Sequence, residues 1–118
     1  MRHLLVSSLV VIIGSIMAAA GCTNPLASED FGCDKTGLQV DPHCIDSTVT
    51  GDVDASKSTC ESQGGKVIDK CGHGLGGCKG VSTSVTSQTT WYFADDTTKT
   101  IDDVKKKCAD TGRTFVDP

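Results

Sequence analysis

The sequence predicts an α+β fold: a small disulfide-stapled domain with two short helices on a three- to four-stranded antiparallel sheet, after a cleaved signal peptide. Three observations support this prediction. The chain of 118 residues contains seven cysteines, and its first 21 residues are mostly apolar or small. A unit with a cysteine and a glycine at fixed spacing also occurs twice. Short exported chains with small cores commonly depend on disulfides for stability.

The N-terminal segment has the order of a secretory signal peptide. Arg2 and His3 form a short basic start, Leu4 to Met17 is an apolar run, and Ala18 to Gly21 supplies small residues. A signal peptidase requires such residues at its cleavage site. The apolar run is shorter than the ~20 residues that a membrane-spanning helix needs. We therefore expect residues 1–21 to be a removed leader.

The end of the leader resembles a known motif. Ala19-Ala20-Gly21-Cys22 is similar to the lipobox of bacterial lipoproteins, although the first residue is usually Leu rather than Ala. The resemblance implies that Cys22 becomes the lipidated N-terminus and attaches the protein to a membrane. The following residue is Thr23 rather than Asp, which in that family implies the outer membrane. Two or three fatty chains would hold the protein firmly at the cell envelope.

Ordinary signal-peptidase cleavage is the alternative. Ala18 and Ala20 satisfy the A-x-A pattern, and cleavage there would release a soluble, secreted cysteine-rich effector or inhibitor. The cysteine count bears on this choice, because seven leaves one unpaired thiol in an oxidising compartment. Lipidation of Cys22 removes that thiol and leaves six cysteines for three disulfides.

The charge of the chain restricts its partners. Eleven Lys and Arg stand against fifteen Asp and Glu, a formal net charge of −4. Nucleic acids and anionic lipid headgroups attract basic surfaces, so we expect no nucleic-acid partner. The expected membrane contact is the lipid anchor, and an envelope protein is a further candidate partner.

The mature chain divides into a tether and one domain. Residues 22–32 are polar and contain Pro25, so we expect a flexible tether there. Residues 33–118 form the cysteine-rich domain, whose first part, to Val53, is expected to be rich in loops. The domain contains an internal repeat, residues 53–69 and 101–117, offset by forty-eight positions. Each unit predicts a short helix, a glycine stop and a strand.

The second unit shows the helix signals most clearly. Thr100 is the expected N-cap, and Asp103 occupies the third helical position in a variant of the capping box. Ile101, Val104 and Cys108 share one helix face. Glycines at positions 112 and 64 are the expected stops of the two helices.

The segment between the repeats predicts strands. Cys78 to Thr83 and Thr89 to Ala94 are rich in β-branched and aromatic residues. Alternation places Trp91 and Phe93 on one face and Tyr92 on the other. We expect the first two to belong to the core, with an exposed binding patch as the alternative. From Cys60 to Pro118 the cysteine, glycine and aromatic pattern is similar to small cysteine-rich lipoprotein domains of uncharacterised function in Gram-negative bacteria, a resemblance that brings no catalytic residues.

Six cysteines allow fifteen pairings. Cys71 and Cys78 flank a glycine-rich loop and are expected at the neck of a hairpin. Cys60 and Cys108 occupy equivalent positions on two helices that could pack together. These two pairs leave Cys33 and Cys44 for each other. The expected disulfides are Cys33–Cys44, Cys60–Cys108 and Cys71–Cys78.

Other motifs do not predict chemistry. The stretch Gly72 to Gly77 matches G-x-G-x-x-G, but a dinucleotide site needs a strand before it and a helix after it. His43 and His73 lie near cysteines, yet no C-x2-C pair accompanies them, so we expect no metal or cofactor. The chain also has no C-x-x-C and no G-x-S-x-G, the motifs typical of thiol–disulfide exchange and serine hydrolysis.

Three pairs of aspartates are weak candidates for a cation site. Asp52 and Asp54 begin like a calcium loop, but Lys57 replaces its glycine and Gln63 its final glutamate. Asp95-Asp96 and Asp102-Asp103 are expected at helix starts. We therefore predict a lipid-anchored envelope protein with a structural or binding role, not an enzyme. A metal-binding or redox protein is a third hypothesis, which predicts free thiols or bound metal.

Overall fold

The computed structural model describes residues 27–80, 82–83 and 86–118. The predicted leader and Cys22 lie outside the described residues. Over these residues the domain is α+β, as predicted, with one six-stranded antiparallel sheet and two helices. The elements are β1 Ser28–Asp34, β2 His43–Thr50, α1 Val53–Ser62, β3 Lys66–Ile68, β4 Gly76–Lys79, β5 Thr86–Tyr92, α2 Ile101–Asp110 and β6 Thr114–Val116.

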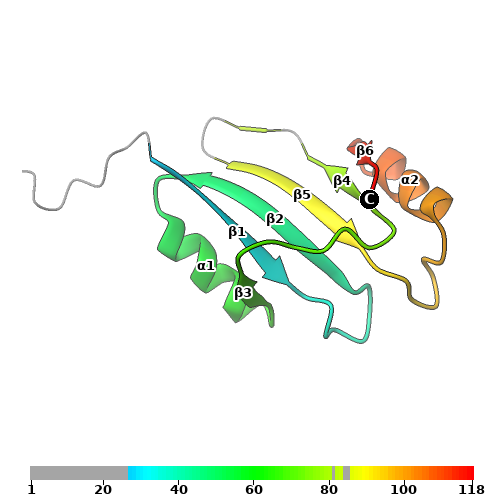
Figure 1. The fold of residues 1–118 in the computed structure, drawn as a ribbon, viewed down its shortest axis with the longest axis horizontal. Helices are drawn as coiled ribbons and strands as arrows, with labels where there is room; N and C mark the ends of the chain where they lie inside the picture. The colour runs from blue at the N-terminus through cyan, green and yellow to red at the C-terminus, as the bar shows by residue number, and fades with distance from the viewer. Residues whose placement is uncertain (1–26, 81, 84–85) are drawn as a thin grey trace, which may run out of the picture.

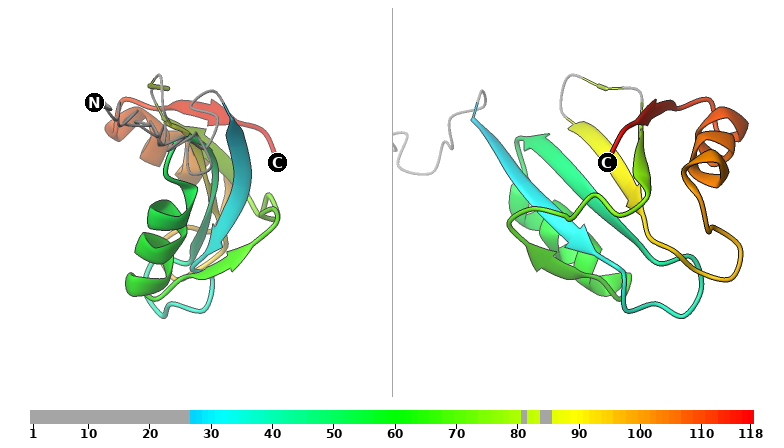
Figure 2. Two further views of the ribbon diagram at one scale, coloured as in Figure 1. Left: turned by 90° about the vertical axis from the view of Figure 1, so that its left-hand side faces the viewer. Right: turned by 45° about the vertical axis from the view of Figure 1, so that its right-hand side comes forward.

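The strand order is β3-β1-β2-β5-β4-β6, and all neighbouring strands are antiparallel. Both helices lie on one face of the sheet, which we call the helix face (Figure 1, Figure 2). The chain between β3 and β4 crosses the opposite face. We call residues 69–75 the strap, and the sheet face beneath them the strap face.

The internal repeat is larger than the sequence predicted. It comprises two ββαβ halves: β1, β2, α1 and β3, then β4, β5, α2 and β6. Their registers match, because Cys33 pairs with Ile45 and Val67. In the second half Cys78 pairs with Thr90 and Phe115. The halves meet where β2 pairs with β5, and the short strands β3 and β6 form the two sheet edges.

The strand prediction was incomplete. The strands expected near residues 78–83 and 89–94 and after the two repeat helices are present as β4, β5, β3 and β6, whereas β1 and β2 were missed. The described residues form six strands rather than the expected three or four. The expected tether of residues 22–32 is wrong from Ser28 onward, because β1 begins there and pairs along its whole length with β2; residues 22–26 lie outside the described residues. Phe31 within β1 is only 5% exposed. The expected loop region also contains β2. Both strands are rich in polar residues, so their sequences lack a strong apolar pattern.

The repeat helices have the predicted ends. The Thr100 side chain accepts from the Asp103 backbone N–H, and the Asp103 side chain accepts from the Thr100 backbone N–H, so the capping box is confirmed. Gly64 and Gly112 follow the helices with φ of +81° and +66°, the left-handed conformation that glycine adopts easily. The predicted glycine stops are therefore confirmed.

The core of the described residues contains two small apolar clusters, one on each sheet face, and further buried apolar side chains beneath α1. On the helix face Cys78, Tyr92, Val104 and Cys108 are buried, with Leu75 and Phe115 packed against them. The strap-face cluster contains Cys44, Cys71 and Trp91, with Ile68, Phe93 and Val116 packed against them. The predicted core positions of Trp91 and Phe93, opposite Tyr92, are confirmed.

All three expected disulfides were wrong. The disulfides are Cys33–Cys60, Cys44–Cys71 and Cys78–Cys108. Cys33 and Cys44 lie on paired strands, but in adjacent cross-strand pairs whose side chains point to opposite faces. Cys71 and Cys78 are also on opposite faces of the sheet: Cys71 lies on the strap face and Cys78 on the helix face. Cys60 and Cys108 lie on helices that pack over different strands, so each bonds to the strand beneath it.

Candidate functional site

The strap is fixed to the sheet by one disulfide and by close backbone packing. Cys71 bonds to Cys44 of β2, with Cα atoms 5.8 Å apart. Gly32 of β1 lies directly beneath, where a Cβ atom would come within 2.9 Å of the Ile68 side chain and 3.2 Å of the Cys71 nitrogen. A side chain at position 32 would therefore push the strap away from the sheet. The strap is thus a rigid part of this surface.

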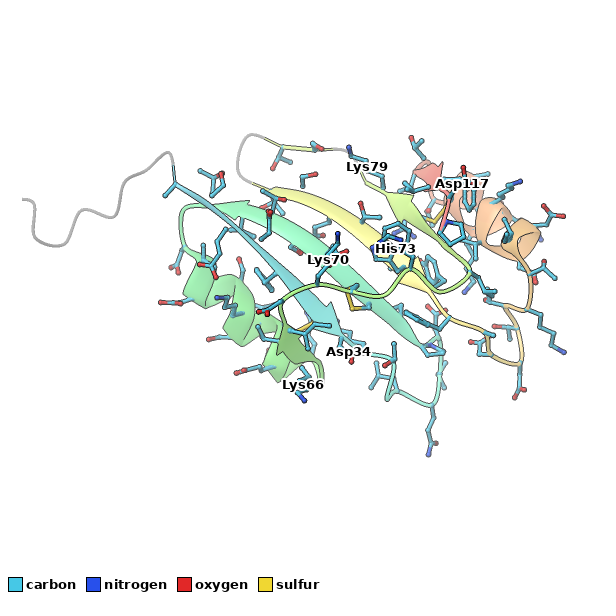
Figure 3. The ribbon with its side chains drawn as sticks, viewed as in Figure 1. Asp34, Lys66, Lys70, His73, Lys79 and Asp117 are labelled. Carbon is cyan, nitrogen blue, oxygen red and sulfur yellow. A yellow bond between two sulfur atoms is a disulfide. The ribbon has the colours of Figure 1, made fainter. Side chains whose placement is uncertain are left out.

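Asp46 joins the strap to the indole of Trp91. One carboxylate oxygen accepts from the Cys71 backbone N–H at 2.8 Å, and the other accepts from Trp91 Nε1 at 2.8 Å. The His73 ring stacks on Trp91, with ring centroids 4.1 Å apart and planes 17° from parallel (Figure 3). Trp91 is only 6% exposed, because the strap covers it. The alternative of an exposed aromatic patch is therefore wrong.

The glycines of the G-x-G-x-x-G match have a packing role. Gly77 lies against Trp91, and a Cβ atom there would approach the indole to 2.7 Å. Gly74 has φ +53°, and a Cβ atom there would clash with the Tyr92 carbonyl oxygen. A strand, β4, follows this stretch, where a dinucleotide fingerprint requires a helix. The expected disulfide-closed flexible loop is therefore a tightly packed crossing whose two cysteines bond elsewhere.

Beside the strap the sheet has an open hollow of about 260 Å³, which we call the strap site. Asp30 accepts the Thr48 hydroxyl at 2.6 Å along its floor. Lys70 extends from the strap over this part of the sheet (Figure 3). Carboxylate, hydroxyl and ammonium groups therefore surround a space large enough for one or two side chains. Its lining residues are Asp30, Phe31, Asp46, Ser47, Thr48, Asp69, Lys70, Ser87 and Thr89.

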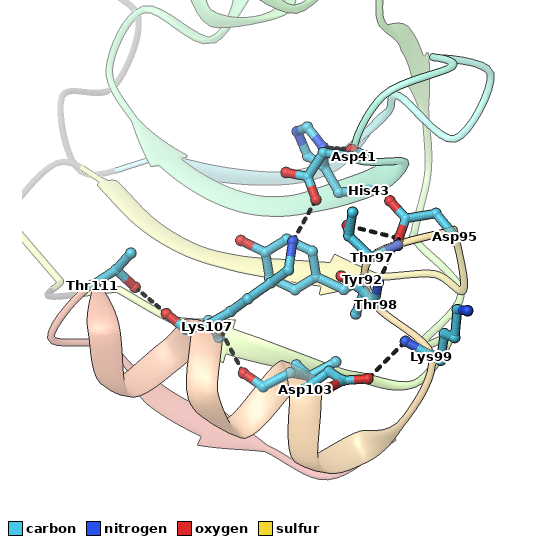
Figure 4. Close-up of polar contacts among 12 residues, drawn as sticks. Asp41, His43, Tyr92, Asp95, Thr97, Thr98, Lys99, Asp103, Lys107 and Thr111 are labelled. Atoms are coloured by element: carbon cyan, nitrogen blue, oxygen red, sulfur yellow. Dashed lines mark hydrogen bonds and ion pairs between the residues drawn. The ribbon is translucent and has the colours of Figure 1, made fainter.

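A second polar cluster connects the two halves on the other side of the molecule (Figure 4). Lys107 of α2 donates to Asp41 in the β1–β2 loop at 2.7 Å and lies 4.9 Å from the Tyr92 ring centroid. Arg113 donates to the Tyr92 hydroxyl at 2.8 Å and to Thr90 at 3.2 Å. Every charged group here has a partner within the chain, so this cluster is a structural connection between the halves.

Asp103 holds the start of α2, and Asp95 fixes the turn before it. Backbone N–H groups of Thr98 and Thr97 donate to Asp95, and these bonds lower the pKa of its carboxyl. Backbone N–H groups of Lys99 and Thr100 donate to Asp103 and likewise lower its pKa (Figure 4). Hydrogen bonds to a carboxylate favour its ionised form. Asp103 therefore acts in the helix-start role that the sequence predicted, whereas Asp95 closes the turn that precedes the N-cap Thr100.

The candidate metal ligands are not brought together. His43 lies on the helix face, where its Nδ1 is 2.6 Å from the Asp41 carbonyl oxygen, while His73 lies on the strap face. Asp52, the first residue of the candidate calcium loop, caps α1 by accepting from the Ala55 backbone N–H at 2.9 Å. Among the described residues, no three His, Cys, Asp or Glu side chains are placed to hold a metal ion.

No helix in the described part of the chain has the length and apolar character needed to cross a membrane. Comparison of the chain with protein-family models, curated proteins and solved structures finds no match in any of the three. The site must therefore be interpreted from its own residues.

Sequence reasoning identified Trp91 and His73 but missed the residues that organise them. Asp46 stands in a polar stretch with no local motif. Its role depends on strand pairing, which places it next to Trp91 on the strap face. Asp30, in the predicted tether, was missed for the same reason. Only knowledge of β1 and β2 as strands could have brought these two carboxylates together.

Proposed function

We propose that the protein is a lipid-anchored protein of the cell envelope, in the outer membrane, with a structural or binding role and no catalytic activity. The observation that carries this proposal is the disulfide set. All six cysteines of the domain are paired, so Cys22 alone lies outside the scaffold. Disulfides of this density are typical of oxidising compartments outside the cytoplasm. A cysteine at the end of a signal peptide then fits the lipobox resemblance.

The domain is suited to binding rather than to reaction chemistry. Three disulfides and two small apolar clusters fix a sheet with polar groups on both faces. Its paired cysteines offer no thiolate for nucleophilic attack. A rigid scaffold with a polar hollow lowers the entropic cost of binding a partner. The third hypothesis, a metal or redox protein, receives no support from the fully paired cysteines.

Intact-mass spectrometry of the protein from its producing cell, with sequencing of its N-terminal peptide, tests the proposal. We expect a chain that begins at acylated Cys22 and whose mass corresponds to three disulfides. A Cys22→Ser variant should accumulate as unprocessed precursor. An unmodified N-terminus near Gly21 with protein in the medium would overturn the lipid anchor. The A-x-A pattern of Ala18 and Ala20 favours that second candidate, a soluble secreted effector or inhibitor.

A further inference from the structure

The two halves are related by a pseudo-twofold axis between β2 and β5. The matched registers make Cys33 equivalent to Cys78 and Ile45 equivalent to Thr90. On the strap face, the same relation makes Cys44 equivalent to Thr89 and Asp46 equivalent to Trp91. Cys44 pairs with Trp91, and Asp46 pairs with Thr89. These two cross-strand pairs are therefore copies of one another, side by side at the centre of the sheet.

In the part of the chain that the structure describes, only one of these two equivalent positions is covered. The strap lies over the first pair, bonded to Cys44 and stacked on Trp91 through His73. Over the second pair, none of the residues that the structure describes forms a corresponding segment. The strap site opens there instead, and Thr48 at its floor is exposed. The strap itself thus shows what kind of group fits this surface: an extended polypeptide segment.

The charges of the strap site indicate which side chains such a segment would carry. Asp30, Asp46 and Asp69 contribute three carboxylates, and Lys70 is the only cation among the residues that line the hollow. Carboxylates bind Lys and Arg side chains through charge-assisted hydrogen bonds. The hydroxyls of Ser87 and Thr89 can hydrogen-bond a passing backbone. A volume of about 260 Å³ is below the usual ~300–1,000 Å³ of drug-sized ligand sites.

We propose that the strap site binds an extended segment of a partner polypeptide, which lies alongside the strap and inserts a Lys or Arg side chain between the carboxylates. The segment occupies the position that the pseudo-twofold axis relates to the strap. This inference rests on the proposed binding role and names its partner class. It does not depend on the lipid anchor.

A displayed library of random twelve-residue peptides, selected on the full-length purified protein, tests the proposal. We expect Lys or Arg to be enriched at one position of the binding peptides. The Ser87→Trp variant fills the hollow and should weaken binding at least about tenfold. Asp30→Asn combined with Asp69→Asn should weaken it about fivefold, because partly exposed charge pairs contribute modestly.

The control is Gln88→Trp, which places the same Trp side chain on the neighbouring residue, where it faces the helix side. Binding must survive this substitution. Failure to enrich basic peptides, loss of binding in Gln88→Trp, or full binding to Ser87→Trp would each overturn the proposal. Concentration-dependent dimerisation abolished by Ser87→Trp would also overturn it, since a second copy would then be the occupant. The N-terminus of the same preparation, sequenced separately, shows whether the anchor proposal fails independently.

Discussion

The two ββαβ halves share strand registers and an equivalent disulfide, yet they hold their helices differently. In α1 the only buried residue is Cys60, whereas α2 buries both Val104 and Cys108. The position equivalent to Val104 is Ser56. The second helix also has a full capping box, while Asp52 of α1 makes a single side-chain cap. The difference teaches that one backbone plan can be stabilised mainly by a disulfide in one copy and by packing and caps in the other.

Removal of the equivalent disulfides should have the largest effect on stability and should show the difference between the halves most clearly. Cys33→Ala with Cys60→Ala, and Cys78→Ala with Cys108→Ala, should each lower the free energy of unfolding by about 2–5 kcal/mol. Amide hydrogen exchange should then distinguish the two halves. We expect α1 to lose amide protection in the first variant, because no other buried side chain holds it. In the second variant Val104 should preserve part of the protection of α2. Equal loss in both helices would contradict this explanation.

Substitutions at the equivalent positions 104 and 56 should have the next largest effect on stability. Val104 is fully buried, so Val104→Ser should cost about 2–3 kcal/mol through lost apolar contact and a buried hydroxyl. The matched change Ser56→Val adds apolar surface at a half-buried position and should leave stability unchanged or raise it. Chemical denaturation of both variants measures the difference. Equal destabilisation by the two substitutions would show that the helices are held alike.

The caps give a smaller contrast. Thr100→Ala removes the N-cap of α2 and should lower the free energy of unfolding by about 1 kcal/mol. Thr100→Ser keeps the hydroxyl and is the control. Thermal denaturation of the two variants should give a lower melting temperature only for the alanine. A similar loss in the serine variant would indicate that the threonine methyl group, rather than the cap, is responsible.

The pH dependence of the second half should be the smallest effect. Asp95 and Asp103 have lowered pKa values in the folded protein, so protons bind the unfolded state more readily. Their stabilising effect is complete above the ordinary pKa of 3.8 and is lost as the pH falls through the lower folded values. Urea denaturation between pH 6 and about pH 2 should show this loss. Asp103→Asn should flatten the curve, whereas Asp96→Asn, from the preceding turn, should not; equal curves would contradict the assignment.

Sequence predicted the parts of this fold that have local signals. The capping residues Thr100 and Asp103 lie three positions apart, and the glycine stops follow their helices directly, so both helices could be placed. Strands β1 and β2 carry few large apolar residues, and their stability comes from pairing with distant segments. The disulfides depended on which sheet face each cysteine occupies. The face of each cysteine cannot be assigned until the bounds and register of the strands are known.

The same dependence explains why the strap site was only partly predicted. Trp91 and His73 stood out as residue types, but their stacking requires the strap to cross the sheet. Asp30 and Asp46 come from different strands, and only the β1–β2 register brings them to one hollow. No local pattern in the sequence encodes such a crossing.

The connectivity of the cysteines has a consequence for biogenesis. Cys33–Cys60 and Cys44–Cys71 interlock in the sequence, because Cys44 lies between Cys33 and Cys60, and Cys60 lies between Cys44 and Cys71. If the chain crosses a membrane from its N-terminus into an oxidising space, Cys33 and Cys44 are the first cysteines of the domain to emerge and can be oxidised to each other before their native partners arrive. Thiolate attack on that early bond is then needed to release both sulfurs. Maturation of this small domain should accordingly depend on a disulfide isomerase as well as an oxidase.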